Sequence, residues 1–188
     1  MIPSKKYLRL LTLALILLPT LAFSQVKGMW VVHYSLTSPA SVKKIVRSAR
    51  QAGITDLFVQ FFAKGEAYYY SQNLPTAACV SKDFDPLALM LKECKASGIK
   101  MHAWINVYFI WSSEADPRDK RHVYYRGKSW FAADAEGRSL KDYSQKELDR
   151  KGLEGVYLSA ASPEVKQYLR ELVREILFKY DVDGIHLD

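Results

Sequence analysis

The stretch Asp183-Gly184-Ile185-His186-Leu187-Asp188 decides the fold. Its residues alternate, so Gly184, His186 and Asp188 share one face of a predicted strand and the two apolar residues between them share the other. This pattern suits a (β/α) barrel, whose outer face meets helices and whose upper interior holds polar side chains. Asp188 would then stand at the carboxyl end of its strand, where a catalytic acid is expected.

The chain upstream repeats a strand followed by a helix. Apolar runs and helical stripes predict strands at residues 29–33, 56–62, 100–106 and 183–188, and helices at 40–52, 86–97 and 163–180. Asp85 and Ser162 are expected to cap the second and third helices, and Gly98 to end the second. Such repeats predict an α/β fold with parallel strands joined by right-handed crossovers.

Four strand–helix steps fit two architectures. One is a small open α/β sheet; the other, which we favour, is the N-terminal half of a (β/α)8 TIM-type barrel, ending after strand 4. A complete barrel takes roughly 250 residues, and this chain has 188. The strand-to-helix connections are much longer than the helix-to-strand ones. Extra residues therefore gather at the carboxyl ends of the strands, where both architectures carry their sites.

Residues 1–24 have the pattern of a secretory signal peptide. A basic start precedes the apolar run 10–18, and small residues stand before Gln25. A membrane span is the alternative, but the uncharged run is shorter than the roughly 20 residues that a bilayer requires. We therefore expect one domain over residues 25–188, exported to the periplasm, cell envelope or exterior, without a stable membrane anchor after cleavage.

The charge balance is mildly basic. The full chain has 27 Lys and Arg against 20 Asp and Glu, a net charge of +7. Loss of Lys5, Lys6 and Arg9 with the signal peptide lowers this to about +4. Because the two signs are mixed along the sequence, we expect an ordinary solvated surface and no nucleic-acid partner.

The chain has two cysteines, Cys79 and Cys94. Cys94 shares a helical face with Leu87 and Leu91, which favours a buried free thiol. Export would also permit a disulfide to Cys79, so both states stay open.

Alternation assigns side chains to the barrel interior. The apolar residues of 100–106 should meet the helices, which turns the residues between them inward. By this rule the inward set is Phe58, Gln60, Phe62, His102, Trp104 and Asn106. The first strand is apolar on both faces apart from His33, so its facing stays open. An inward polar cluster needs hydrogen-bond partners or a ligand, because unpaired buried polar groups cost free energy.

The connection after Asn106 is long and rich in aromatic and basic residues. Aromatic faces over a cleft can stack on the C–H faces of sugar rings, and Trp111 and Trp130 are the first candidates for such platforms. The alternative is that these residues pack a small core inside the loop, because a loop of this length needs one.

Several segments together resemble a known family. They are residues 27–32, 56–71, 84–108, 155–165 and 180–188. In order and spacing they resemble the bacterial glycosyl hydrolase-like 10 domain family. The resemblance implies a (β/α)8 barrel, export, and action on glycans such as bacterial wall or other envelope polysaccharide. It also implies that Asp188 is the acidic residue at the end of strand four, while the family motif continues beyond it.

Glycoside hydrolysis normally uses two carboxyl groups. Our hypothesis assigns Asp188 as the nucleophile, or as the stabiliser of an oxocarbenium-like transition state, with a general acid from a later strand. The fragment alone would then be inactive, and Glu66 is the one loop carboxylate considered as a substitute. The expected substrate-binding residues are Gln60, His102, Trp104, Asn106, His186, Trp111 and Trp130, and we expect no cofactor.

Two other functions remain open from the sequence. A metal-dependent hydrolase of the deacetylase or amidohydrolase type would use His33, His102, His186 and Asp188 as ligands, although none of the usual zinc-motif spacings is present. A barrel of the same kind could also bind glycan without cleaving it.

Overall fold

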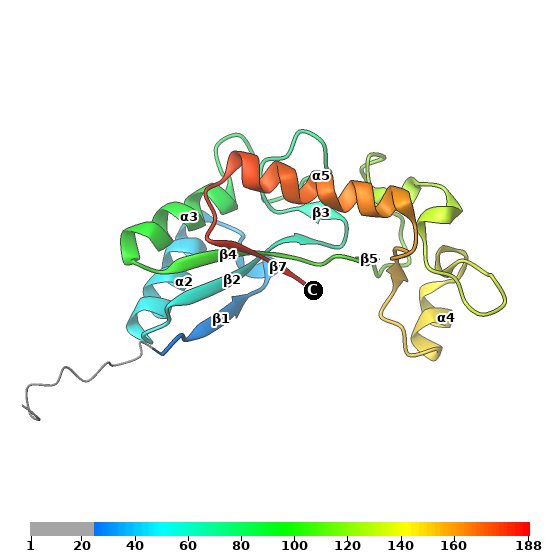
Figure 1. Cartoon of the computed structure of the whole chain (residues 1–188), viewed down its shortest axis with the longest axis horizontal. Helices are drawn as coiled ribbons and strands as arrows, with labels where there is room; N and C mark the ends of the chain where they lie inside the picture. The colour runs from blue at the N-terminus through cyan, green and yellow to red at the C-terminus, as the bar shows by residue number, and fades with distance from the viewer. Residues whose placement is uncertain (1–24) are drawn as a thin grey trace, which may run out of the picture.

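The chain forms a five-stranded sheet in which four strands run parallel, with helices on one face (Figure 1). The computed structural model describes residues 25–188, so the expected signal peptide lies outside the described residues. The main elements are β1 (Gly28–Val31), α2 (Pro39–Gln51), β2 (Asp56–Ala63), α3 (Pro86–Ser97), β4 (Lys100–Ile105), α5 (Pro163–Lys179) and β7 (Gly184–Leu187). The strand order is β1-β2-β4-β7, and each neighbouring pair is parallel. The predicted alternation of strands and helices is confirmed.

The helices begin and end at the signals in the sequence. Asp85 caps α3, and Gly98 ends it with a φ of 68°, a left-handed conformation that glycine adopts without strain. Ser162 caps α5. Helix α2 begins at Pro39, one residue earlier than predicted, because Ser38 forms a capping box at its start.

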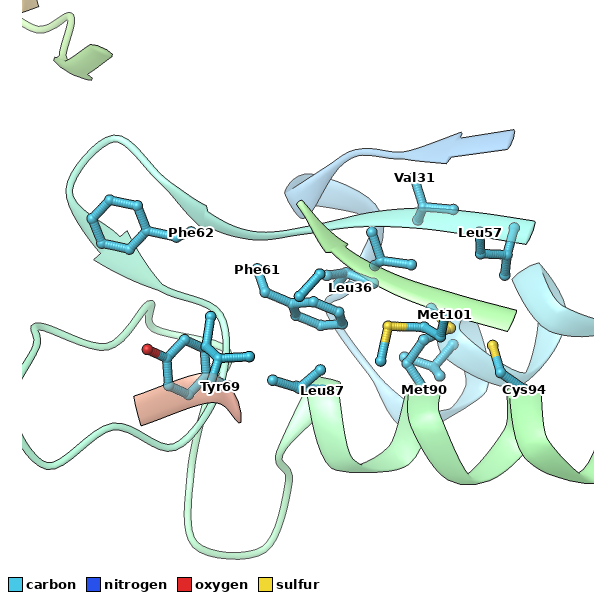
Figure 2. Close-up of a cluster of buried hydrophobic side chains, with 14 of the residues drawn as sticks. Val31, Leu36, Leu57, Phe61, Phe62, Tyr69, Leu87, Met90, Cys94 and Met101 are labelled. Atoms are coloured by element: carbon cyan, nitrogen blue, oxygen red, sulfur yellow. The ribbon is translucent and has the colours of Figure 1, made fainter. Parts of the chain in front are cut away.

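All three helices pack on the same face of the sheet. The buried strand residues on this face are Leu57, Val59, Met101, Ala103 and Ile105, and the buried helix residues are Val42, Val46, Ala49, Leu87, Met90, Cys94, Leu172 and Ile176. Figure 2 shows Leu87, Met90 and Cys94 on the side of α3 that faces the strands. An open doubly wound sheet carries helices on both faces and reverses its strand order. Sequential strands covered on one face are instead typical of a (β/α) barrel.

A β-bulge near the carboxyl end of β2 reverses the face of the sheet to which the following side chain points. Gln60 pairs with Trp104, but Phe62 then pairs with Ile105, so β2 gains one residue between the two pairs. Alternation predicts that Phe62 points into the barrel, and this prediction is wrong. Phe62 is fully buried on the helix side, where its ring centroid lies 6.4 Å from that of Tyr168 in α5.

Residues 107–161 fold around a core of their own, and we call them the loop module. In Figure 1 the loop module extends beyond the carboxyl end of β4. It contains β5 (Phe109–Trp111), three 3-10 turns (Val123–Tyr125, Lys128–Trp130, Leu140–Asp142), α4 (Gln145–Arg150) and β6 (Val156–Tyr157). Its buried apolar residues include Ile110, Val123, Phe131, Leu140, Leu148, Val156 and Leu158. The small core that the sequence analysis gave as an alternative is thus present.

The two cysteines are free thiols. Cys94 is fully buried between α3 and the sheet, and this burial raises the pKa of its thiol to about 12. The open alternative of a Cys79–Cys94 disulfide is therefore not formed. Among the helices of residues 25–188, none has the length and apolar character to cross a bilayer.

Gly184 has no side chain, and the His102 ring occupies the space where a Cβ would lie. A larger residue at position 184 should therefore destabilise the fold. A Cβ at this position would lie 2.6 Å from His102 Nδ1. We expect Gly184→Ala to lower the free energy of unfolding by about 1–3 kcal/mol, measured by chemical denaturation. Gly127→Ala is the control, because a Cβ there meets nothing within 4 Å. Equal losses of stability in the two variants would contradict the prediction.

Candidate active site

The face of the sheet opposite the helices carries the candidate site. Strand register arranges its side chains in rows: Trp30, Phe58 and His102 with Gly184 first, then Gln60, Trp104 and His186, and finally Asn106 and Asp188 at the carboxyl ends. The predicted inward facing of His102, Trp104 and His186 agrees with this register. The side chains of β4 on this face are partly exposed, whereas those of the other face are fully buried.

Asp188 is held in place through both its backbone and its side chain. Its N–H donates to Ile105 (3.0 Å) and its carbonyl accepts from Val107 (2.7 Å), so the parallel ladder continues through this residue. The Nε1–H of Trp104 donates to Asp188 Oδ2 at 3.1 Å. Trp104, which the sequence analysis lists among the expected substrate-binding residues, therefore orients the carboxylate directly. The carboxylate is exposed and free to meet a ligand.

His102 lies lower, toward the amino ends of the strands. Its Nε2 is 2.9 Å from Asp56 Oδ1, and its ring stacks on Phe58 with centroids 4.7 Å apart. Hydrogen bonds from Thr55 and His102 lower the pKa of Asp56. His102 thus belongs to a paired network two rows away from Asp188, a position that suits support of the sheet.

We expect Asp56→Asn to destabilise the fold by about 1–3 kcal/mol at neutral pH, because His102 loses an ionised partner. The lowered pKa of Asp56 means that its stabilisation is present above the usual value of 3.8 and is lost as the pH falls through the folded-state pKa. The difference between wild type and variant should therefore shrink in acid. Thermal unfolding across pH measures this, with the exposed Asp83→Asn as a control that should show no such trend.

Gln60 connects His33, which follows β1, to Asn106 at the end of β4. Its Oε1 accepts from the backbone N–H of His33 (3.1 Å) and lies 2.6 Å from His33 Nδ1, while its Nε2 donates to Asn106 Oδ1 (2.8 Å). Because the backbone N–H can only donate, the atom that it meets is oxygen, and His33 Nδ1 must carry a proton. Gln60 is only 6% exposed. It therefore positions Asn106 beside Asp188.

Trp30 is a site residue that the sequence analysis missed. It stacks on Phe58 with centroids 4.9 Å apart, and its Nε1–H donates to His186 Nε2 at 3.4 Å. Its side chain is 56% exposed on the inner face. The facing of β1 was left open because both its faces are apolar, and only the pairing of Trp30 with Phe58 decides it.

Glu66 lies on β3 (Glu66–Ala67), a short strand that pairs antiparallel with the end of β2. Burial, followed by the charge of Asp119, raises the pKa of its carboxyl group. Two residues on, the Tyr68 ring packs 4.8 Å from that of His33, which binds Gln60. Glu66 is therefore a partly buried carboxyl group near the carboxyl end of the sheet.

These features have counterparts in known proteins. Residues 25–188 match the family model described as Glycosyl hydrolase-like 10. The chain belongs to the glycosyl hydrolase-like 10 family. The resemblance seen in the sequence motifs is thereby confirmed.

Two curated members give the scale of the similarity. The chain is 24% identical over 153 residues to glycosyl hydrolase YngK of Bacillus subtilis strain 168, covering 77% of this chain and 26% of that protein. It is 24% identical over 198 residues to glycosyl hydrolase DigH of Escherichia coli K12, covering 86% of this chain and 41% of that protein. The chain thus spans well under half the length of these relatives.

Solved structures share the fold. The maltogenic α-amylase AmyB of Thermotoga neapolitana superimposes with a TM-score of 0.56 at 13% identity, over 88% of this chain and 39% of that one. Other structures with this fold are complexes with glucose or with a pentasaccharide substrate. At such low identity the likeness establishes the fold alone, that of TIM-barrel glycosidases.

Trp111 and Trp130 are the two residues that the sequence analysis predicted to stack on sugar rings. Trp111 and Trp130 both belong to the loop module and pack against its core. Trp111 donates its Nε1–H to the carbonyl of Ala115 (2.9 Å), and its ring meets that of His122 at 5.2 Å. Trp130 packs on Tyr168 of α5 at 5.9 Å. Tyr168 also touches Phe62 on the helix side of the sheet, so Trp130 lies away from the inner face that carries Asp188.

The alternative metal site is not assembled. His33 is bound to Gln60, His102 to Asp56, His186 to Trp30 and Asp188 to Trp104. Within residues 25–188, no three His, Cys, Asp or Glu side chains gather closely enough to hold a metal ion. The structure therefore gives the metal-dependent hydrolase hypothesis no geometric support.

The raised pKa of Glu66 predicts a pH dependence that a substitution should remove. The stabilisation from its protonated form is present below the usual value of 4.5 and is lost as the pH rises through the folded-state pKa. Glu66→Gln should therefore gain stability relative to wild type as the pH rises from the usual value of 4.5 through the folded-state pKa. Differential scanning calorimetry measures this difference. The exposed Glu114→Gln is the control, and an unchanged pH trend in the Glu66 variant would oppose the assignment.

Proposed function

We propose that this chain is a glycoside hydrolase-like domain acting on a bacterial cell-envelope or extracellular polysaccharide, with Asp188 as nucleophile or transition-state stabiliser. One observation carries the proposal: Asp188 stands at the carboxyl end of a parallel strand and is oriented by Trp104 above an aromatic inner face. In barrels of this kind, the carboxyl ends of the strands are where chemistry is placed. The sugar complexes of other structures with this fold support a carbohydrate partner.

The geometry suits stabilisation of positive charge on a sugar ring. A carboxylate fixed by one hydrogen bond keeps its other oxygen free for the developing oxocarbenium-like centre, and a preorganised charge costs no reorganisation during reaction. Asn106 and His186 flank Asp188 on the same face and are placed to meet sugar hydroxyls. Gln60 is buried and acts as a positioning residue in this mechanism, whereas His102, paired with Asp56, supports the sheet.

Glycoside hydrolysis also requires a second carboxyl group, which acts as the general acid. Asp56 lies at the opposite end of the sheet and is bound to His102, so it is not available beside Asp188. We propose that the general acid comes from a later strand of a half barrel, and that these residues alone bind glycan without hydrolysing it. A groove of about 730 Å³ between β7 and α5, where Phe178 is 91% and Leu187 60% exposed, supports a further strand–helix unit packing there.

The site of action is part of the proposal. We propose export to the periplasm, envelope or exterior through residues 1–24, with removal of that segment and no stable membrane anchor afterwards. The basic start followed by an apolar run supports this. The polysaccharide is the expected partner, and we propose no role in nucleic-acid binding.

A cationic iminosugar, which mimics the charge of the transition state, tests the role of Asp188. We expect Asp188→Asn to weaken iminosugar binding at least about tenfold, while binding of a neutral envelope oligosaccharide changes less than about threefold. Titration calorimetry measures both affinities, and the exposed Asp83→Asn is the matched control.

Three outcomes would count against this function. Failure of the chain to bind any envelope oligosaccharide would remove the glycan assignment. Equal effects of Asp188→Asn on the two ligands would favour a barrel that only binds glycan. Release of reducing ends by the chain alone would contradict the need for a carboxyl group from a later strand.

A further inference from the structure

Four polar residues form a row across the carboxyl ends of the strands. His33 follows β1, Gln60 lies near the end of β2, Asn106 follows β4 and Asp188 follows β7. The backbone of Asp188 bonds to Ile105 and Val107, the residues on either side of Asn106. Asn106 and Asp188 are therefore neighbours on paired strands, which lie about 4.8 Å apart.

A backbone group fixes the direction of the hydrogen bonds in this row. The N–H of His33 can only donate, so the Gln60 atom that it meets at 3.1 Å is the oxygen. The other end of the Gln60 amide is then its NH2 group, which can only donate to Asn106 at 2.8 Å. Asn106 must receive this bond through its oxygen and turn its own NH2 group away from Gln60. Because Gln60 is buried, rotating either amide would place like groups together at a high cost.

The NH2 group of Asn106 is left for a ligand. Within residues 25–188, no acceptor is bonded to Asn106 Nδ2, and the side chain is partly exposed. Asp188 has the opposite character, because an ionised carboxylate can only accept, and one of its oxygens already accepts from Trp104. Two neighbouring strand ends therefore present a donor and an acceptor.

A sugar hydroxyl matches this pair of groups. Its oxygen accepts from an N–H, and its proton is donated to a carboxylate. An ether or ester oxygen at the same place keeps the acceptor but has no proton to donate. A ring carbon that bears only hydrogen meets neither group. A free hydroxyl thus satisfies both residues at once, which a substituted position does not.

We propose that Asn106 is a donor-only specificity residue of the glycan site, and that Gln60, held by the backbone of His33, is the positioning residue that sets this polarity. The bound sugar carries an unsubstituted hydroxyl that accepts from Asn106 and donates to Asp188. Sugars with an ester, ether or branch at that hydroxyl are excluded. This inference rests on the proposed function, because it takes the ligand of Asp188 to be a glycan.

Scalar couplings across hydrogen bonds report the polarity by NMR without any ligand. In the wild-type chain we expect one coupling between the backbone nitrogen of His33 and Cδ of Gln60, and one between Nε2 of Gln60 and Cγ of Asn106. In Gln60→Glu the second coupling should instead join Nδ2 of Asn106 to the introduced carboxyl group, because a carboxylate has no proton to donate. A coupling from Asn106 Nδ2 to Gln60 in the wild-type chain would overturn the proposal.

Deoxy and deoxyfluoro analogues of D-glucono-1,5-lactam test how the ligand is read. This ring is uncharged, and each hydroxyl is replaced in turn by hydrogen or by fluorine, which accepts but cannot donate. At one ring position we expect the wild-type chain to bind the hydroxyl most tightly, and fluorine at least about twofold more tightly than hydrogen. Titration calorimetry measures these affinities.

Two variants should reverse the preference for fluorine over hydrogen. Gln60→Glu turns the oxygen of Asn106 toward the ligand, and Asn106→Asp replaces the NH2 group itself while keeping the bond from Gln60. The second variant places no charge at the buried position 60, so it tests the proposal even if the first fails to fold. Gln51→Glu makes the same charge change on the exposed end of α2 and should keep the wild-type order.

The outcomes separate this proposal from the proposed function. An unchanged order in a folded Asn106→Asp variant would overturn the role of Asn106, as would equal binding of the fluorine and hydrogen analogues at every position by the wild-type chain. If no lactam and no iminosugar binds, the proposed function fails and the sugar-reading role fails with it. The NMR couplings would still establish or refute the amide polarity.

Discussion

One-sided burial of four parallel strands is the constraint on which this molecule depends. Helices α2, α3 and α5 all cover the same face, and the core includes fully buried Leu57, Met101 and Ile105. Each such side chain contributes about 1.5–3 kcal/mol when it is removed from water. The other face receives no helix, so it must be stabilised by contacts among its own side chains. This division separates the part of the sheet that stabilises the fold from the part that is free for chemistry.

The face without helices is stabilised by contacts among aromatic rings that carry polar groups. Stacking of Trp30 on Phe58, and of Phe58 on His102, covers apolar surface at the amino ends of the strands. Ring N–H groups then find partners along the strands, which leads to the bond from Trp104 to Asp188. Polar pairing therefore supports the sheet at one end and orients a carboxylate at the other. In the proposed function, the same network that pairs these ring N–H groups also preorganises the charge of Asp188.

The bulge in β2 connects this sheet to the rest of the molecule. By turning Phe62 to the helix side, it gives Tyr168 of α5 a partner beneath the loop module. Tyr168 consequently belongs to the borders of both hydrophobic cores. The loop module is thus anchored through α5, where Trp130 packs on Tyr168.

The sequence by itself determined the alternating elements, the helix caps at Asp85 and Ser162, and the inward facing of His102, Trp104 and His186. These follow from local rules, because a helix or strand repeats its facing at a set period. Only the tertiary structure decided the facing of Trp30, the reversal of Phe62, and the pairings of His102 with Asp56 and Trp104 with Asp188. Those partners lie 46 and 84 residues apart. Their contacts depend on how neighbouring strands align, and no local period encodes that alignment.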